Sequence, residues 1–451
     1  MQNIGHLILF LLIIGLSCAK SPKMLETHFS AHITVADSID NTGDYSGFEF
    51  LVFNRQNLND PIDTLFFEKT DTTGLLKGII PFKSPGAYPA QLNRNGRNLA
   101  TFRFLLADKD TITLSAELPG LEQTLNIDSR EQRAMAIYNR VDASFKRVNR
   151  FIQAGKVPAE KIPAELNIFA DLFWQVFEER KGTFASKLAF ENVITLLQVV
   201  DQNQMMAKIN NSFDQEYAFA MAITLGKKFA ADSRGFEHTI TYLDSVQNLS
   251  SNKTIKAAFE QAIIKLHLDS LYINEAKQLL SKYKRRYEDK EEHSIWYENI
   301  YFELYELTPG EPAPDFEFIT TEGDTVNNQS LLGNPFILEF TLLANKLYQQ
   351  QYDESIVIYQ LYNAKGLNYF TIPFDESVNT IIGFYEERDR FWALADPPSI
   401  NYQTLIDDFN LQFYPTWILI DADGNMVRKY IGEEFEGVIL GINETLITKK
   451  Q

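Results

Sequence analysis

Residues 413–424 read FYPTWILIDADG, in which a proline precedes an apolar run and a turn sequence. The run predicts a strand at 416–421, and a turn at 422–425 leads into a second strand at 426–430, before a last helix from about residue 436. Upstream, short apolar segments alternate with helical ones, which is typical of an α/β fold when the order ends in an antiparallel hairpin. The predicted strands are 336–340, 368–373 and 391–394, and the predicted helices are 345–364, 376–386 and 402–409.

The start of this region carries further motifs. Residues 309–316 read PGEPAPDF, and Glu322-Gly323-Asp324 and Leu331-Leu332-Gly333 follow before the strand at 336–340. This order is similar to that of the redoxin family, which includes peroxiredoxins and the periplasmic thioredoxin-like disulfide reductases of cytochrome maturation. The resemblance covers the last third of the chain, and its most specific part is 413–424. It implies a thioredoxin-like α/β domain over residues 308–451.

The resembled family performs thiol chemistry at a Cys-x-x-Cys motif that opens the helix after the strand corresponding to 336–340. There the helix N-terminus lowers the pKa of the first cysteine, and the second cysteine resolves the mixed disulfide. In the family's register these two positions hold Asn345 and Tyr348, and residues 341–352 contain no cysteine. The peroxidatic cysteine of a peroxiredoxin belongs to the same region. We therefore predict that redox activity is lost, with no catalytic residue and no cofactor.

Two other features of the resembled site are present in this sequence. Pro415 matches the cis-proline that faces the active helix, and Asn345 is a suitable helix N-cap. In the family, backbone beside the proline pairs with an extended substrate by strand addition. The resemblance thus implies a peptide- or protein-binding groove, and the alternative is that Pro415 only keeps a structural turn and the groove is vestigial. The groove residues would be Asn345, Lys346, Tyr348, Tyr414 and Pro415.

The periodicity of the sequence changes twice before this region. Residues 26–120 alternate apolar and polar side chains in short runs separated by turn sequences, which predicts a β-sandwich. This part resembles the small β domain of unknown function found ahead of thioredoxin-like domains in Gram-negative envelope lipoproteins. Residues 126–306 have helical periodicity and predict about seven or eight helices. The predicted strands of the first part are 32–35, 47–53, 64–68, 75–82, 100–106 and 111–114, and the predicted core stripe of the second part is Ile168, Phe169, Leu172, Phe173, Val176 and Phe177.

The predicted fold class is therefore multidomain α+β. It comprises an N-terminal β-sandwich at 26–120, a central all-α helical domain at 126–306 and a C-terminal thioredoxin-like α/β domain at 308–451. No fixed repeat signature supports a named repeat family in the helical part.

The N-terminus resembles an export signal. Residues 7–16 are apolar apart from Gly15, and Gly15-Leu16-Ser17-Cys18 resembles a bacterial lipobox, which implies that residues 1–18 form a lipoprotein-type signal peptide with Cys18 lipidated. Ordinary cleavage after Ala19 and an uncleaved anchor are the alternatives. Ala19 and Lys20 after the cysteine indicate the periplasmic face of the outer membrane. The localisation we predict is the cell envelope.

Composition limits the partners. The 451-residue chain has a formal net charge of −18, which opposes binding to nucleic acid. His28 and His32 would share one face of a strand, but no further ligand completes a zinc set, and Asp421, Asp423 and Asn425 fit a hairpin turn better than a calcium loop. We predict no metal site. The leading hypothesis is a non-catalytic envelope lipoprotein that binds a protein or peptide, and the alternatives are a redoxin that uses a partner's thiol or a non-thiol enzyme acting through the helical domain.

Overall fold

The computed structural model describes residues 24–36, 42–54, 63–287, 291–375, 377–386, 388–432 and 434–448. These residues form two compact units, divided between Phe259 and Glu260. Cys18 and the apolar run before it lie outside the described residues. Of the helices described, none has both the length and the apolar character needed to cross a membrane.

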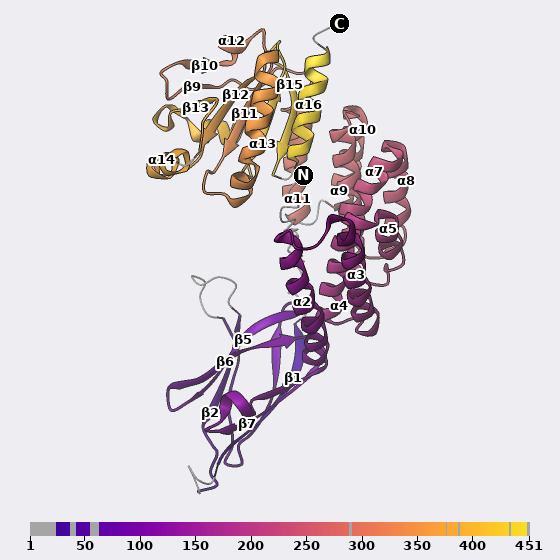
Figure 1. Cartoon of the computed structure of the whole chain (residues 1–451), viewed down its shortest axis with the longest axis vertical. Coiled ribbons are helices and arrows are strands. Elements are labelled where there is room, and N and C mark those ends of the chain that lie inside the picture. Colours follow the sequence, from indigo (N-terminus) through magenta and orange to yellow (C-terminus); the bar gives the residue numbers. More distant parts are fainter. Residues whose placement is uncertain are drawn as a thin grey trace. The chain divides into compact units, whose positions relative to one another are not determined.

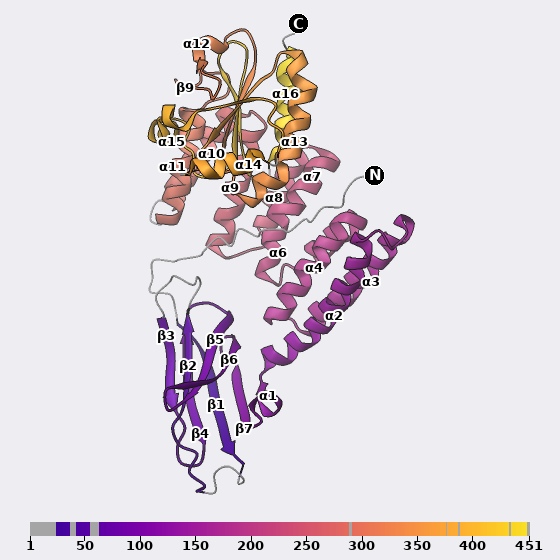
Figure 2. The same ribbon diagram turned by 60° about the vertical axis from the view of Figure 1, so that its left-hand side comes forward.

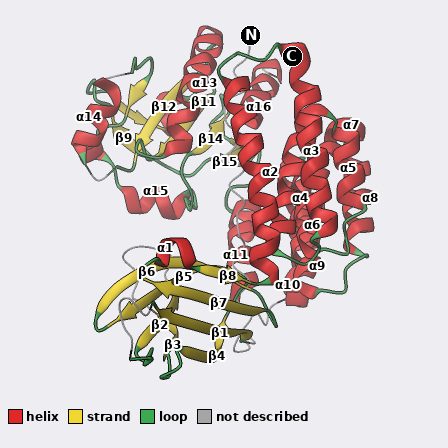
Figure 3. Ribbon diagram, turned by 60° about the horizontal axis from the view of Figure 1, so that its bottom comes forward, coloured by secondary structure: helices red, strands yellow, loops and turns green. Residues whose placement is uncertain are grey.

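The first unit opens with two four-stranded sheets, drawn in yellow in Figure 3. Their strand orders are β4-β1-β7-β8 and β3-β2-β5-β6, and both sheets contribute to one hydrophobic core. Phe29 of β1 lies in this core against Phe50 of β2, with their ring centroids 5.3 Å apart. The bounds are β1 Leu25–Val35, β2 Phe48–Asn54, β3 Asp63–Lys69, β4 Leu75–Phe82, β5 Gly86–Arg94, β6 Arg97–Leu106, β7 Thr111–Leu118, α1 Leu121–Thr124 and β8 Asn126–Asp128.

Helices follow from residue 130 and continue into the second unit. Phe169, Phe173, Val176 and Phe177 are buried as predicted, and they form the core face of α3. The prediction was wrong for two members of that stripe, because Ile168 is 53% exposed and Leu172 is 39% exposed. The bounds are α2 Arg130–Gln153, α3 Ile162–Glu179, α4 Phe184–Val200, α5 Gln202–Asn210, α6 Glu216–Met221, α7 Lys227–Arg234, α8 Phe236–Gln247, α9 Lys253–Asp269, α10 Ile273–Tyr287 and α11 Glu291–Tyr305.

A five-stranded mixed sheet is the centre of the second unit, with the strand order β13-β12-β11-β14-β15. Strands β11, β12 and β13 are parallel, whereas β14 runs antiparallel to both β11 and β15. Helices alternate with these strands in the predicted order, and the closing hairpin is the one predicted from residues 413–430. This is the thioredoxin-like portion of a mixed α/β chain. The bounds are β9 Glu317–Ile319, β10 Thr325–Asn327, α12 Asn328–Leu331, β11 Phe336–Thr341, α13 Lys346–Tyr362, β12 Asn368–Pro373, α14 Val378–Glu386, β13 Ala393–Leu394, α15 Tyr402–Asp408, β14 Thr416–Ile420, β15 Met426–Ile431 and α16 Phe435–Thr448.

The two faces of this sheet bury separate cores, because side chains alternate between faces along each strand. Ile337, Trp417 and Leu419 lie on the face covered by α13, α14 and α16. Phe340 and Ile418 lie on the opposite face, toward α15 and the end of α11. Figures 1 and 2 both show α13 beside the yellow helix α16 on one side of the sheet. The beginning of α13 thereby faces the segment that leads into β14.

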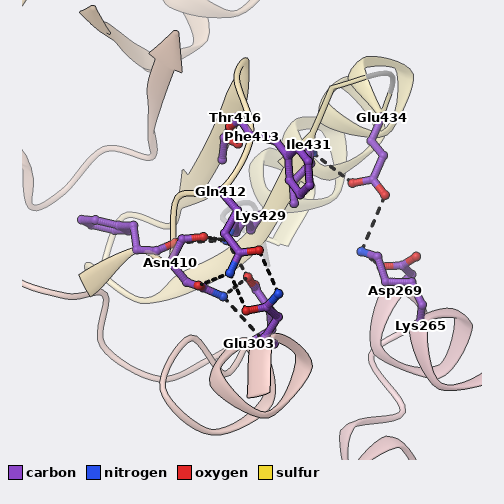
Figure 4. A network of polar contacts seen from close by, with 12 residues as sticks. Lys265, Asp269, Glu303, Asn410, Gln412, Phe413, Thr416, Lys429, Ile431 and Glu434 are labelled. Carbon is purple, nitrogen blue, oxygen red and sulfur yellow. Dashed lines mark hydrogen bonds and ion pairs between the residues drawn. The ribbon is translucent and has the colours of Figure 1, made fainter. Parts of the chain in front are cut away.

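A buried ion pair fixes α11 against β15 (Figure 4). Lys429 of β15 is only 9% exposed, and its Nζ lies 2.5 Å from Glu303 of α11. The same ammonium donates to the carbonyl oxygens of Phe409 at 3.0 Å and Asn410 at 2.8 Å. Burial lowers the pKa of Lys429, and the Glu303 carboxylate opposes that effect. The lysine thus connects α11, the end of α15 and the edge strand of the sheet.

Candidate functional site

Asn345 lies at the start of α13, at the position predicted to correspond to the first redox cysteine of the resembled family. Its Oδ1 accepts from the backbone nitrogens of Leu347 at 2.8 Å and Tyr348 at 3.3 Å, so the predicted N-cap is confirmed. Its Nδ2 donates to the carbonyl oxygen of Tyr414 at 3.1 Å. One amide therefore holds both the first turn of the helix and the residue before Pro415.

The loop before Asn345 is held by a second side chain, a carboxylate. Asp375, just beyond β12, accepts from the backbone nitrogens of Leu343 at 2.8 Å and Ala344 at 3.4 Å. From the helix side, Gln349 donates to the carbonyl oxygen of Leu343 at 2.9 Å. These contacts tie the loop to the carboxyl end of the neighbouring parallel strand. Asp375 was not predicted from the sequence, although its place just after a buried strand was a usable indication.

The segment facing the cap has the predicted backbone. The Tyr414–Pro415 peptide bond is cis, and Pro415 is buried. Tyr414 is half-buried and contacts Phe374, with their ring centroids 4.9 Å apart. The neighbouring Phe413 is 56% exposed. An exposed ring and a half-buried ring therefore lie directly before the proline.

The five predicted groove residues do not all lie at the surface. Lys346 is exposed, and Asn345 and Tyr414 are half-buried. Tyr348 is fully buried, and its hydroxyl donates to Glu339 at 2.9 Å, so the prediction that it lines a groove was wrong. The side chain of Tyr348 points into the core because it lies one turn into α13, on the helix face that packs against the sheet.

Glu339 forms a buried polar centre beneath α13 that the sequence analysis missed. It lies in the middle of β11 and has no exposed surface. Burial raises the pKa of its carboxyl, while the surrounding donors act in the opposite direction. A carboxylate in an otherwise apolar inner strand was the available indication, because such a group must find partners. The donors to its two oxygens are the hydroxyl groups of Tyr348 at 2.9 Å, Tyr369 at 2.7 Å, Ser355 at 3.4 Å and Thr371, and the indole nitrogen of Trp417 at 3.0 Å.

The chemistry available at the start of α13 is hydrogen bonding and apolar contact. The described residues include no cysteine, since the single cysteine of the chain is Cys18. Asn345 and Lys346 present an amide and an ammonium, and neither can exchange with a disulfide. The start of α13 therefore offers polar and apolar contacts but no thiol.

The remaining residues considered for a metal have other environments. His28 and His32 both lie on the exposed face of β1. Asp421 accepts from the backbone nitrogens of Asp423 and Asn425, each at 2.9 Å, as expected for a hairpin turn. Among the residues that the structure describes, no group of three or more His, Cys, Asp or Glu side chains could hold a metal ion.

The thioredoxin-like portion is similar in sequence to thiol-disulfide oxidoreductases. The thiol-disulfide oxidoreductase ResA of Bacillus cereus is 27% identical over 139 residues, which are 31% of this chain and 78% of ResA. The same enzyme of Bacillus anthracis is 25% identical over 139 residues, with the same coverage of both chains. No family model matches the chain.

Solved structures of similar proteins align with the same share of the chain. The thioredoxin domain of a thiol-disulfide oxidoreductase from Bacteroides vulgatus has a TM-score of 0.27 at 17% identity, covering 30% of this chain and 98% of that one. A thioredoxin family thiol:disulfide interchange protein from Chlorobium tepidum TLS has a TM-score of 0.27 at 19% identity, covering 30% of this chain and 96% of that one. Over 31% of its length, this chain is homologous to thioredoxin-like thiol-disulfide oxidoreductases.

Proposed function

We propose that this chain is a non-catalytic protein of the cell envelope that binds an extended segment of another envelope protein beside Pro415. The observation that carries the proposal is the Asn345 side chain, which caps α13 and donates to Tyr414. The resemblance assigns this position to the first redox cysteine. The amide keeps the start of the helix and the proline segment together without a sulfur atom. The scaffold of the site is thus retained while thiol exchange is lost.

The surface proposed to bind is the Pro415 surface, which we define as Asn345, Lys346, Phe413, Tyr414 and Pro415. Tyr348 is left out because its side chain lies in the core. Pro415 is also buried, and it is included for the backbone beside it, which would pair with the ligand. Phe413 offers an exposed aromatic ring, and Lys346 offers an exposed cation directly after the cap. Aromatic rings supply a large contact area, and backbone pairing supplies affinity that tolerates many sequences. The ligand we propose is therefore an extended segment with an apolar side chain for Phe413.

The rest of the chain is proposed to position this surface in the envelope. We propose a lipid on Cys18 as the anchor at the periplasmic face of the outer membrane, followed by a β-sandwich at 26–120 and an all-α domain at 126–306. The shared core of the two N-terminal sheets and the succession of helices from residue 130 support these assignments. The thioredoxin-like domain at 308–451 would then carry the partner-binding surface.

The experiment is site-specific photo-cross-linking in intact cells. A photoreactive phenylalanine analogue replaces Phe413, and the matched control carries the same analogue at Val357, which is 52% exposed on the C-terminal half of α13. We expect a discrete adduct from position 413 that position 357 does not give, and we expect Asn345→Ala to weaken it. Equal adducts at both positions, or none at 413, would contradict the proposal.

A reduction assay separates binding from the alternative that a partner supplies the thiol. Wild-type protein and the Phe413→Ala variant are each purified and mixed with a disulfide substrate and a small-molecule thiol. A mixture without protein gives the background rate of reduction. We expect the same rate with the protein as without it. A rate that rises with the protein and falls in Phe413→Ala would replace the binding proposal with the enzymatic one.

A further inference from the structure

A cavity of about 500 Å³ lies in the first unit, between the first half of α2, the end of α3 and the start of α4. Its lining is strongly basic, although the whole chain has a net charge of −18. Charges of one sign concentrated in a concave site raise the local concentration of the opposite ion. The charged lining residues are Arg130, Arg133, Arg140, Arg180 and Lys181, with Glu179 as the one carboxylate.

Helix electrostatics explain only part of this arrangement. Arg180 and Lys181 follow the C-terminus of α3, where cations are favoured. Arg130 and Arg133 occupy the first turn of α2, where the positive end of the helix disfavours them. Arg140 lies on the same helical face two to three turns further on. The macrodipole of α2 therefore does not account for Arg130 and Arg133.

Protein groups satisfy some of these cations. Arg133 forms an ion pair with Asp128, and Lys181 lies 3.2 Å from Glu178 and 3.6 Å from Asp214. These three carboxylates occupy Arg133 and Lys181. The other arginines of the lining, Arg130, Arg140 and Arg180, are the groups that a ligand could contact.

Three guanidinium groups have unused hydrogen-bonding capacity. Arg130 donates to the carbonyl oxygen of Lys181 at 2.8 Å, which is a neutral acceptor. Within the described part of the chain, Arg140 and Arg180 form no ion pair, and the Nε of Arg180 is buried without a hydrogen-bond partner. A buried N–H that lacks an acceptor is unfavourable. An acceptor bound in the cavity would satisfy it.

The start of α4 is already capped by the protein. The backbone nitrogen of Phe184 donates to Glu131 at 2.9 Å, and that of Ser186 donates to Thr183 at 3.1 Å. A ligand in the cavity would therefore meet guanidinium groups and not free helix nitrogens.

We infer that this cavity binds the phosphate groups of a small phosphorylated molecule. The planar guanidinium matches phosphate oxygens in a bidentate geometry, and Ala134, Ala136 and Ile137 give the lining an apolar side for the rest of the molecule. The volume falls within the range of small-molecule sites. Phosphate chemistry is offered by a free phosphorylated solute and by a phospholipid headgroup, and the experiment distinguishes the two.

The test is isothermal titration of the full chain with inorganic pyrophosphate, with Arg140→Gln and Arg180→Gln as variants. The matched control is Arg147→Gln, which removes an exposed arginine from the same helix outside the cavity. We expect saturable binding of pyrophosphate. Each of the two variants should raise the dissociation constant by about tenfold or more, since a hydrogen bond to a charged group is lost. Arg147→Gln should leave the dissociation constant within about twofold of the wild-type value. Arg140 is exposed, so its variant keeps the test valid if Arg180→Gln does not fold.

Vesicles identify the source of the phosphate. The Cys18→Ser chain, which cannot carry the proposed lipid, is sedimented with phosphatidylglycerol vesicles and with phosphatidylcholine vesicles, with and without the additional change Arg140→Gln. Pyrophosphate binding without sedimentation indicates a free solute, and sedimentation with phosphatidylglycerol that Arg140→Gln abolishes indicates a headgroup. Absence of both kinds of binding, or equal weakening by Arg147→Gln, would overturn the inference.

Discussion

Asn345 uses both ends of its amide, one as an acceptor for the first turn of α13 and one as a donor to Tyr414. Few side chains can replace it, because aspartate lacks the donor and serine lacks the reach. A cysteine at this position would lose both hydrogen bonds but would lie at a helix N-terminus that stabilises a thiolate. A cysteine at position 345 would therefore exchange these two hydrogen bonds for a more reactive thiol.

The first prediction concerns Asn345→Cys in a Cys18→Ser background. We expect a thiol pKa below the usual value of about 8.5 and faster alkylation at pH 7 than for Gln350→Cys, an exposed position further along α13. We also expect a loss of about 1 kcal/mol in unfolding free energy, because the N-cap is removed. Iodoacetamide kinetics against pH measure the thiol pKa. Equal alkylation rates at 345 and 350 would contradict the predicted lowering of the thiol pKa at the start of α13.

The second prediction concerns the buried carboxyl of Glu339. Burial raises its pKa, so the folded chain holds the proton more tightly than the unfolded chain. The resulting stabilisation is complete below about pH 4 and is lost as the pH rises through the raised pKa. We therefore expect wild-type protein to lose unfolding free energy relative to Glu339→Gln as the pH rises from about 4 to 8.

Urea unfolding at a series of pH values measures this difference. Glu298→Gln, at an exposed position of α11, is the control, and its curve should run parallel to that of the wild type. A Glu339→Gln curve that also runs parallel to the wild type would contradict the prediction.

Individual site residues were predictable where the resemblance to the redoxin family points to them. Asn345 and Pro415 come from that resemblance, and the structure brings Asn345 into contact with Tyr414, the residue before the cis-proline. The inward direction of Tyr348 was not predictable, because it depends on how α13 is rotated against the sheet. Glu339 was recognisable as an anomaly in β11, but its partners come from three other elements of the chain, α13, β12 and β14.

At the scale of elements, one buried ion pair, between Glu303 and Lys429, joins α11 to β15. Lys429 is deeply buried and satisfies two carbonyl groups besides Glu303. Removal of one member of a buried pair leaves an uncompensated charge, whereas removal of both does not. The pair therefore contributes more to the position of α11 than to the free energy of unfolding.

The third prediction follows from this pair. We expect Glu303→Leu to lower the unfolding free energy by about 3 kcal/mol or more, since it leaves the Lys429 ammonium buried alone. The double variant Glu303→Leu/Lys429→Met should be more stable than Glu303→Leu. Because burial lowers the pKa of Lys429, the defect of Glu303→Leu should shrink as the pH rises toward about 10. A double variant less stable than Glu303→Leu would contradict this account.

The order of elements in the second unit was predictable because each apolar run has a distinct length and is bounded by turn residues. Strand β5 was not predicted, since Pro89 interrupts its pattern and proline is uncommon in an inner strand. The small hairpin of β9 and β10 was also missed, because three-residue strands carry too little periodicity. The error at Ile168 and Leu172 arose because the predicted stripe was wider than the face that α3 buries.

At the scale of the whole molecule, we propose an anchor near the N-terminus and a separate binding surface in the C-terminal third of the chain. The domain ranges 26–120, 126–306 and 308–451 stay predictions, and the structure divides its residues at 259/260. The final helices of the predicted middle domain thus belong to the same compact unit as the sheet. Contacts between distant parts of the chain place these helices in that unit. One of them is the contact between Lys429 and Glu303, which lie 126 positions apart in the chain.

The fourth prediction concerns localisation. Cys18→Ser removes the sulfur that a lipid would modify, so we expect the protein to move from the membrane fraction to the soluble periplasmic fraction. Fractionation followed by immunoblotting measures the shift, and metabolic labelling with a fatty acid should mark the wild type alone. Unchanged membrane attachment of Cys18→Ser would reject lipidation and favour an uncleaved anchor.

The contact between Tyr348 and Glu339 bears on which evolutionary routes are open to this chain. A cysteine at 345 requires only a change near the surface, whereas a cysteine at 348 removes a large ring from the interior and one donor from a buried carboxylate. Introducing the second sulfur, at 348, therefore costs more folding stability than introducing the first. A chain with a cysteine at 345 alone would form mixed disulfides that it could not resolve.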